Sequence, residues 1–405
     1  LTGDVNNNFL RGGDGNDILN GKDGNDLLQG DAGDDTLIGG FGDNTLRGGA
    51  GNDTLSGAAT FQNRAVDFNR IDYRDALDGV TITLSGGTGS ASSTAVSVST
   101  GTDTLINAEF AYGSAFADSV IIESSFANRQ GANGWFEFEG GGGDDSLVNN
   151  GSGVARVGYR TALDGVTVDL EAGTASSSTG TAAGIGNDTF SGVRSVRGSD
   201  FDDTLFGNTS TSINDEFRPR GGNDAIDGRD GLGDLVRYSG ASGNVIVDLG
   251  TDNQTIAVTT ASDGFGGQDT LIRIENVRSG SGDDQLSGDV NNNVLIGGGG
   301  ADSLVGRGGN DALLISDAGF NLVDGGSGQD TLGLREGFTL DLGSVAGTIS
   351  SIEAISLNTS NSATLTATLA DVVNLSSEIN VAVDSAAASQ IPGTPISATD
   401  SILVS

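Results

Sequence analysis

The chain has 405 residues, with 68 Gly, only 3 Pro, and no His, Cys or Met. Asp and Glu number 55 against 19 Lys and Arg, so the formal net charge is −36. This balance excludes a nucleic-acid partner, which requires a basic surface, and it favours a fold built around bound cations, since like-charge repulsion otherwise opposes compaction.

The first predicted elements are short strands that return every nine residues. Residues 12–20, 21–29, 30–38, 39–47 and 48–56 follow the pattern Gly-Gly-x-Gly-x-Asp-x-apolar-x, and a worn copy begins at Gly3. The glycines allow tight turns. The eighth position supplies one inward apolar side chain per strand, at Leu10, Leu19, Leu28, Leu37, Leu46 and Leu55.

The sixth position of each copy carries an oxygen-bearing side chain, at Asn8, Asp17, Asp26, Asp35, Asn44 and Asp53. In any single copy, Asp and Asn next to Gly could be present only because such pairs form turns well. They do not explain a column of carboxylates, which would repel one another without a metal. Calcium binds six to eight oxygen ligands, more than one loop can supply, so we expect neighbouring coils to share each ion.

This run resembles the nonapeptide repeat of the repeats-in-toxin (RTX) family. The resemblance implies an all-β fold, namely a right-handed parallel β-solenoid (β-roll or β-helix) with calcium ions in stacked Gly/Asp-rich turns and two nine-residue units per coil. Asp17, Asp35 and Asp53 would then line one edge, and Asn8, Asp26 and Asn44 the other. Because the second edge lacks two carboxylates, we expect weaker ions there.

Further calcium-type loops occur later in the chain. A second run steps by nine from residue 280 to 311, and single loops occupy 140–147, 220–226 and 325–332. A single loop without a stacked neighbour would be a turn and not a site. The predicted calcium-ligating residues are Asn8, Gly12, Asp14, Gly15, Asp17, Gly21, Asp23, Gly24, Asp26, Gly30, Gly33, Asp35, Asn44, Gly48, Gly51, Asp53, Asp118, Asp145, Asp203, Asp224, Asp284, Asn293, Asp302, Asp311 and Asp330.

A longer repeat runs over residues 73–84, 159–170 and, more loosely, 238–249. It resembles a unit of large secreted RTX proteins and bacterial surface proteins. Residues 80–84 alternate as a strand with one buried face does. Each copy continues through a Ser/Thr-rich stretch to an Asp-Thr pair, then to Gly-Ser and a further Asp. We expect wider coils, with residues 90–100 and 172–183 as lateral loops or hairpins; flexible linkers are the alternative.

Past Gly333 the Gly-Asp pattern stops. Residues 339–342, 349–355 and 364–369 alternate as strands, and 371–375 could start a short helix. Residues 400–405 resemble the ending of proteins exported by type I secretion systems, and a capping coil is the alternative. The predicted division is an RTX β-roll at 1–57, a wider solenoid at 58–279, a second RTX β-roll at 280–332, and at 333–405 a cap with a secretion signal.

No catalytic motif is recognisable, and we predict that the protein is not an enzyme. The missing His and Cys exclude Ser–His–Asp and Cys–His groups and His-based zinc sites. Residues 240–244 miss the Gly-x-Ser-x-Gly pattern by one position. Arg156, Arg160, Arg194 and Arg197 would bind acidic sugars or, more commonly, pair with acids on a solvated face. Residues 135–138 form an aromatic cluster that we expect in the core.

The function expected from these features is that of a calcium-dependent structural protein, secreted to the surface of a bacterium. We expect it to self-assemble as a homopolymer into a surface layer, filament or matrix, with cell-surface polysaccharide as a further partner. No stretch approaches the ~20 apolar residues of a membrane span. The chain begins at Leu1 without a visible signal peptide, which suggests a processed or truncated end. The alternatives are an adhesin stalk or carbohydrate-binding module, and the calcium-binding region of a larger RTX enzyme.

Overall fold

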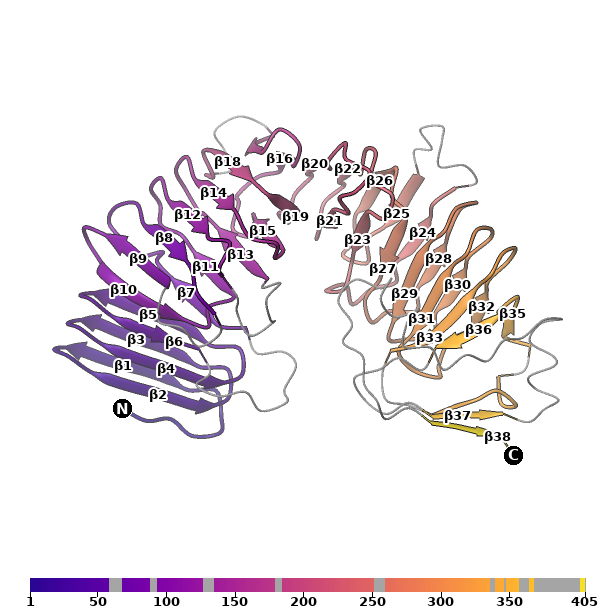
Figure 1. Cartoon of the computed structure of the whole chain (residues 1–405), viewed down its shortest axis with the longest axis horizontal. Coiled ribbons are helices and arrows are strands. Elements are labelled where there is room, and N and C mark those ends of the chain that lie inside the picture. The colour runs from indigo at the N-terminus through magenta and orange to yellow at the C-terminus, as the bar shows by residue number, and fades with distance from the viewer. Residues whose placement is uncertain are drawn as a thin grey trace. The chain divides into compact units, whose positions relative to one another are not determined.

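The computed structural model describes residues 1–57, 68–87, 93–126, 135–178, 184–250, 259–335, 339–345, 347–356, 364–367 and 401–404. Every regular element within these ranges is a β-strand (Figure 1), which confirms the all-β prediction. No helix that could cross a membrane occurs in this part of the chain. The chain divides into two compact units, Leu1–Thr204 and Leu205–Ser405.

The first unit is a parallel solenoid with two sheets. The first sheet contains, in spatial order, β1 (Phe9–Asp14), β3 (Leu27–Ala32), β5 (Thr45–Ala50), β7 (Arg70–Asp72), β11 (Phe110–Tyr112), β13 (Phe136–Glu139), β15 (Ala155–Gly158) and β19 (Val193–Arg197). All of these neighbours pair in parallel.

The second sheet of this unit contains β2 (Ile18–Asp23), β4 (Thr36–Phe41), β6 (Thr54–Ser56), β10 (Gly101–Ile106), β9 (Ser93–Ser97), β8 (Thr81–Leu84), β12 (Ser119–Ile122), β14 (Ser146–Asn149), β18 (Asn187–Ser191), β17 (Thr174–Ser177) and β16 (Val166–Asp169). Successive strands of the chain alternate between the two sheets over the nine-residue run. Leu19 pairs with Leu37, and Leu28 with Leu46. One coil therefore comprises two nine-residue units, as the RTX resemblance implies.

Two features of the repeat stabilise this coil, namely the inward leucines and the glycines of the turns. Leu19, Leu28, Leu37, Leu46 and Leu55 are completely buried and stack into a continuous core. Such parallel stacking brings successive turns into close contact. At Gly33, φ is +130° and an added Cβ would collide with the carbonyl oxygen of Gly15 in the preceding coil, so only glycine fits there.

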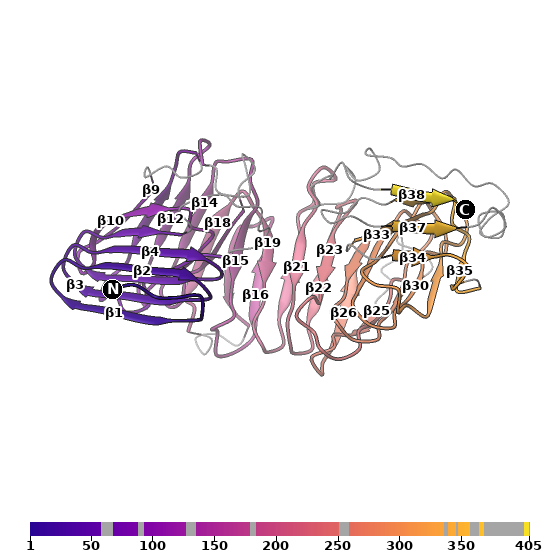
Figure 2. The same cartoon turned by 90° about the horizontal axis from the view of Figure 1, so that it is seen from below.

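The long repeats interrupt the second sheet with antiparallel meanders. β9 pairs antiparallel with both β8 and β10, and β8 then continues the parallel stack through β12. Within this meander the strands lie side by side in the order β10, β9, β8, which is the reverse of their order in the chain (Figures 1 and 2). β16, β17 and β18 repeat this arrangement. The hairpin prediction for residues 90–100 and 172–183 is confirmed for 93–100 and 172–178, the part that the structure describes.

The second unit repeats the same architecture. Its first sheet contains β21 (Glu216–Arg218), β23 (Leu235–Arg237), β27 (Asn276–Arg278), β29 (Val294–Gly298), β31 (Ala312–Ile315), β33 (Thr331–Leu334) and β36 (Ala354–Ser356). Its second sheet contains β22 (Ala225–Asp227), β26 (Gln268–Ile272), β25 (Thr259–Ser262), β24 (Ile246–Asp248), β28 (Gln285–Ser287), β30 (Ser303–Val305), β32 (Leu322–Asp324) and β35 (Ile349–Ser350). β20 (Thr204–Phe206) lies where the chain passes from one unit to the other. A third antiparallel meander, β26-β25-β24, interrupts the second sheet.

The C-terminal region adds a small parallel sheet of β34 (Thr339–Asp341), β37 (Thr364–Ala367) and β38 (Ser401–Val404). Strands are confirmed in 339–342 and, within its described part, in 364–369. In place of one strand over 349–355 the structure has two, β35 and β36, which are separated by residues 351–353 and belong to different sheets. The predicted helix at 371–375 lies outside the described residues. Of the predicted aromatic cluster, Phe136 and Phe138 are in the core as expected. The four-part division of the chain stays a prediction.

Candidate metal centres

The sixth-position aspartates form a hydrogen-bonded column along one edge of the first coils. The backbone N–H of Asp17 donates to Oδ1 of Asp35 (2.7 Å), and that of Asp35 donates to Oδ1 of Asp53 (2.8 Å). Each step of this column spans the 18 residues of one coil. The edge that the RTX resemblance implies for these three residues is therefore present.

The second oxygen of these carboxylates has no such donor. Oδ2 of Asp35 and of Asp53 is buried and has no hydrogen-bond partner among the described residues. Burial raises the pKa of Asp53 from 3.8 to about 6 and also raises that of Asp35. Leaving a buried carboxylate oxygen unpaired is costly. A cation beside Oδ2 would remove this cost.

Glycines at the first position of the repeat create the space around this oxygen. A Cβ added at Gly30 would collide with Oδ2 of Asp35 and with the carbonyl oxygen of Gly48 in the next coil. A Cβ at Gly21 would likewise collide with Oδ2 of Asp26 and the carbonyl of Gly39. A carboxylate oxygen and a backbone carbonyl oxygen therefore converge where a side chain is missing. Such an oxygen-only environment fits calcium.

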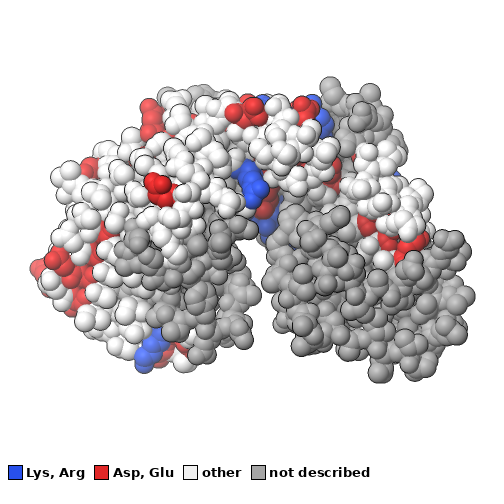
Figure 3. All heavy atoms as spheres, viewed as in Figure 1, with Lys and Arg blue, Asp and Glu red and all other residues white. Residues whose placement is uncertain are grey.

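Each coil contributes one carboxylate to such a point. Nowhere in the described ranges do three or more His, Cys, Asp or Glu side chains gather in a way that could hold a metal. Backbone carbonyls and water would complete the six to eight oxygen ligands that calcium takes. In the view of Figure 3, acidic side chains gather at the margin of the first coils. Of the predicted third-position ligands, Asp14 has an exposed side chain and Asp23 is half-buried.

The other edge is built on asparagine and aspartate in alternation. The N–H of Asn8 donates to Oδ1 of Asp26 (2.7 Å), and the N–H of Asp26 donates to Oδ1 of Asn44 (3.0 Å). Oδ2 of Asp26 has no donor in the described part of the chain. The amide nitrogen of Asn44 instead donates to backbone carbonyls of its own turn and to Asn69. This edge therefore contains fewer unpaired carboxylate oxygens.

The loop at residues 140–147 has stacked neighbours, so it is not one of the unstacked loops that would be turns only. The N–H of Asp118 donates to Oδ1 of Asp145 (2.8 Å), and the N–H of Asp145 donates to Oδ1 of Asp188 (3.0 Å). The reason is that the long repeats keep the turns in register although their sequence pattern changes. Burial raises the pKa of Asp145 to about 9, and within the described residues its Oδ2 has no donor.

Asp118 and Asp203 differ from Asp145 because serine follows the first glycine of their loops. Ser114 donates its N–H to Oδ2 of Asp118 (2.6 Å) and its hydroxyl to Oδ1 (2.9 Å). Ser199 does the same for Asp203, at 2.7 Å in both cases. Both carboxylates are already hydrogen-bonded at each oxygen, which makes them weaker candidates for a cation than Asp145.

The second unit contains further stacked carboxylates. The N–H of Asn293 donates to Oδ1 of Asp311 and the N–H of Asp311 to Oδ1 of Asp330, both at 2.8 Å. On the opposite edge, Asp284 donates its N–H to Asp302 (3.0 Å) and Asp224 donates to Asp269 (3.0 Å). In the region that the structure describes, the buried oxygens without a donor include Oδ2 of Asp284, Asp311 and Asp330.

One buried carboxylate of this kind escaped the sequence prediction. Asp234 is fully buried, burial raises its pKa to about 8, and its Oδ2 has no donor among the described residues. Its Oδ1 accepts the N–H of Asp215 (2.7 Å). The loop starting at Gly228 has one residue more than the nine-residue pattern before its Asp, which hides the repeat. The sequence could still have indicated this loop by its glycines at 228 and 231 and by the apolar pair Leu235-Val236 that follows Asp234.

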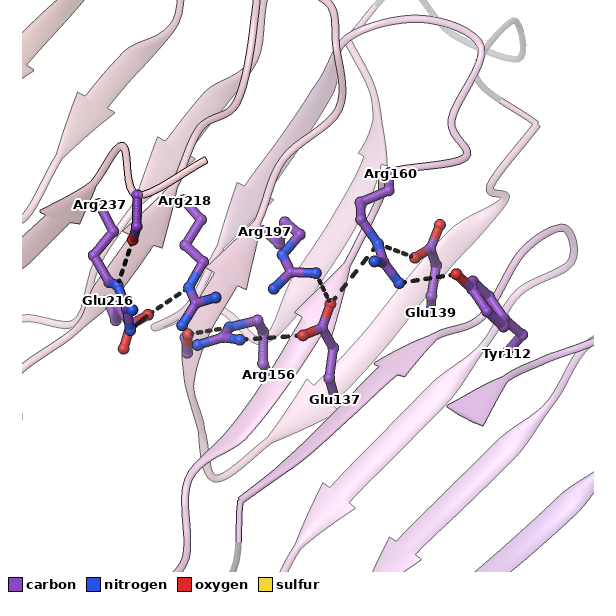
Figure 4. A network of polar contacts seen from close by, with 11 residues as sticks. Tyr112, Glu137, Glu139, Arg156, Arg160, Arg197, Glu216, Arg218 and Arg237 are labelled. Atoms are coloured by element: carbon purple, nitrogen blue, oxygen red, sulfur yellow. Dashed lines mark hydrogen bonds and ion pairs between the residues drawn. The ribbon is translucent and has the colours of Figure 1, made fainter. Parts of the chain in front are cut away.

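The arginine cluster proves to be an internal ion-pair network (Figure 4). In the first unit, fully buried Arg156 contacts Glu137 at 3.1 Å, Arg197 contacts the same carboxylate at 2.8 Å, and Arg160 contacts Glu139 at 2.9 Å. The expectation of pairing with acids is confirmed for Arg156, Arg160 and Arg197, whereas no ion pair of Arg194 is found among the described residues. The expected solvated face is wrong for Arg156, which is buried together with Glu137. In the second unit, Arg218 and Arg237 both contact Glu216.

Comparison with known proteins identifies the repeat. The family described as RTX calcium-binding nonapeptide repeat matches four copies, at residues 1–28, 29–59, 278–313 and 313–338. These residues carry the two regular runs of stacked turns. Repeats of this family bind Ca²⁺ in stacked turns, and the oxygen-lined points described above fit that ion. No curated protein matches the chain.

Proposed function

We propose that this RTX calcium-binding repeat protein is a secreted structural protein that folds on meeting calcium outside the cell and then self-assembles. The observation that carries the proposal is the column of buried carboxylates whose Oδ2 atoms have no donor in the described ranges, as at Asp35 and Asp53. Without cations, a net charge of −36 opposes folding. Millimolar extracellular calcium suits sites of roughly 10⁻⁴–10⁻³ M affinity.

In this proposal the sixth-position carboxylates hold the ions together with backbone carbonyls of the turns. The bound ion supplies positive charge where the carboxylate and carbonyl oxygens converge. The ion then stabilises the column, because Oδ1 of each carboxylate already accepts the backbone N–H of the preceding coil. The carboxylates proposed as strongest are Asp26, Asp35, Asp53, Asp145, Asp234, Asp311 and Asp330. Asp284 is left out because its carboxyl also accepts hydrogen bonds from Ser279 and from the N–H of Gly280.

The second part of the proposal is that the folded chain assembles into a layer, filament or matrix. Phe9 and Leu27 are register partners in β1 and β3, and both are exposed, by 62% and 38%. Ile18 is exposed on the other sheet. Apolar side chains that adjoin on the outer surface favour contact with another protein surface. A second copy of this chain is the partner that the proposal assigns to them.

The test is calcium removal followed by calcium addition. The purified chain would be dialysed against a chelator, and calcium would be added back while circular dichroism and electron micrographs are recorded. The proposal expects β-structure and ordered polymers to appear with calcium and to vanish with chelator. A chain that folds but stays monomeric would overturn the assembly and favour an adhesin stalk or a calcium-binding region of a larger enzyme. An unchanged spectrum would overturn the calcium-dependent fold.

A further inference from the structure

A buried tyrosine hydroxyl contacts a sixth-position carboxylate in each of the three long repeats. Tyr73 donates to Oδ2 of Asp103 at 2.9 Å, and Tyr238 donates to Oδ2 of Asp269 at 2.8 Å. Tyr159 and Asp188 are hydrogen-bonded in the same way. Tyr73, Tyr159 and Tyr238 are exposed by no more than 4%.

Asp103 is the next residue of the column that begins at Asp17. The N–H of Asp53 donates to Oδ1 of Asp103 at 3.0 Å, and Leu55 pairs with Leu105 in the adjoining strands. Oδ1 therefore has the same role in Asp103 as in Asp35 and Asp53. The two kinds of position differ at Oδ2, which has no donor in the described residues at Asp53 and has the tyrosine hydroxyl at Asp103.

The tyrosines occur where the parallel stack is interrupted. Tyr73 precedes β8, Asp103 lies in β10, and the antiparallel strand β9 lies between these two strands. β10 has β6 as its parallel neighbour and β9 on its other side, so no parallel coil continues the column beyond Asp103. Asp188 in β18 and Asp269 in β26 have corresponding places beside β17 and β25.

We propose that Tyr73, Tyr159 and Tyr238 occupy the place of a calcium ion at the ends of the three carboxylate columns that meet a meander. The hydroxyl donates to the carboxylate that a cation would otherwise contact. These three columns of ions therefore end one coil before the meander, and Asp103, Asp188 and Asp269 bind no calcium. Burial and the facing aspartate raise the pKa of each tyrosine well above 10, so the hydroxyl keeps its proton. This inference rests on the proposed placement of calcium.

The neighbouring positions Asp53 and Asp103 provide a matched pair for the test. Asp103→Asn retains Oδ1 for the N–H of Asp53, and its amide can donate to the Tyr73 hydroxyl. Asp53→Asn replaces the negatively charged carboxylate beside the proposed cation by a neutral amide. The amount of bound calcium would be measured by equilibrium dialysis on the full-length chain and both variants. We expect Asp103→Asn to bind as many ions as the wild-type chain, and Asp53→Asn to lose at least one. Asp35→Asn replaces Asp53→Asn if the latter does not fold.

A loss of calcium in Asp103→Asn equal to that in Asp53→Asn would overturn the inference and leave the proposed function intact. A wild-type chain that binds no calcium would overturn both. Tyr73→Phe gives a second readout. Under the proposal the hydroxyl is not a calcium ligand, so Tyr73→Phe should bind at least as many ions as the wild-type chain in the same equilibrium dialysis. A loss of one ion in Tyr73→Phe would show that the hydroxyl helps to hold calcium at Asp103 and would contradict the proposal.

Discussion

The side-chain amide nitrogen of Asn44 lies 3.2 Å from the carbonyl oxygen of Gly40 and donates a hydrogen bond to it. The same nitrogen donates to the carbonyl of Gly42 at 3.1 Å. At Asp53, the equivalent position on the other edge, a carboxylate oxygen without a donor within the described residues replaces this nitrogen. An amide can satisfy the turn carbonyls itself, whereas a carboxylate needs a cation between itself and them.

Replacing this amide should therefore create a calcium site. In Asn44→Asp, we expect one additional bound ion or a calcium affinity higher by on the order of tenfold, because ligand charge sets the affinity of such sites. Isothermal titration with calcium is the measurement. Asn25→Asp is the control, since Asn25 is exposed and its Oδ1 only accepts the N–H of Asp43. An equal gain in both variants would show that net charge, and not the turn, is responsible.

The stability of the calcium-free chain should fall as the pH rises. Burial raises the pKa of Asp53 to about 6, of Asp311 to about 7 and of Asp145 to about 9, from 3.8 in the unfolded chain. At a pH between 3.8 and the folded-state pKa of each group, the folded chain holds a proton that the unfolded chain has released. The free energy of unfolding therefore decreases as the pH rises. In chelator, circular dichroism should therefore show more β-structure at about pH 5 than at about pH 8. Calcium displaces these protons, so its affinity should rise over the same range. More β-structure in chelator at the higher pH would contradict the burial of these groups.

Removing one core leucine should destabilise the solenoid strongly. Leu37 is completely buried between Leu19 and Leu55 of the adjoining coils. Leu37→Ala should lower the free energy of unfolding in calcium by about 2–5 kcal/mol, because it leaves a cavity. Val98→Ala, at a side chain that is 96% exposed, should change it by less than ~0.5 kcal/mol. Chemical denaturation measures both, and similar losses would place Val98 in an unrecognised contact.

The ion pair between Glu137 and Arg156 should be sensitive to the loss of one partner. Both side chains are fully buried. Glu137→Gln leaves an uncompensated buried charge, which costs roughly 3–5 kcal/mol. Arg11→Gln removes a pair whose arginine side chain is 63% exposed, and should cost less than about 1 kcal/mol. Thermal unfolding in saturating calcium compares the two. A small effect for Glu137→Gln would mean that solvent reaches this network.

Turn glycines should tolerate substitution only where the backbone allows it. Gly33→Ala places a Cβ at φ +130° against the carbonyl of Gly15, and should cost at least about 2 kcal/mol. Gly87 has open space around its Cβ position, so Gly87→Ala should be neutral within roughly 0.5 kcal/mol. Melting temperatures in calcium would distinguish the two. Equal effects would indicate that the turn at Gly33 can rearrange.

The sequence by itself determined the coil. The nine-residue period places an apolar residue in every strand and a glycine-rich turn after it. Each of these features is specified by neighbouring residues in the chain and needs no distant contact. The columns of Asp17, Asp35 and Asp53 follow because strands of equal length stack in register. The short strands and the oxygen-bearing turns could therefore be predicted from the pattern, and the solenoid with its two edges from the resemblance to RTX repeats.

Only the tertiary structure decided the features that depend on distant pairing. The place of β9 between β10 and β8, the contact of Tyr73 with Asp103 and the burial of Arg156 each join residues from different strands. Nothing in the nine-residue period specifies these contacts, since antiparallel insertion changes which strand adjoins which. For the same reason, Asp103 and Asp53 look alike in the sequence, and only packing gives Oδ2 of Asp103 a tyrosine hydroxyl and leaves Oδ2 of Asp53 without a donor among the described residues.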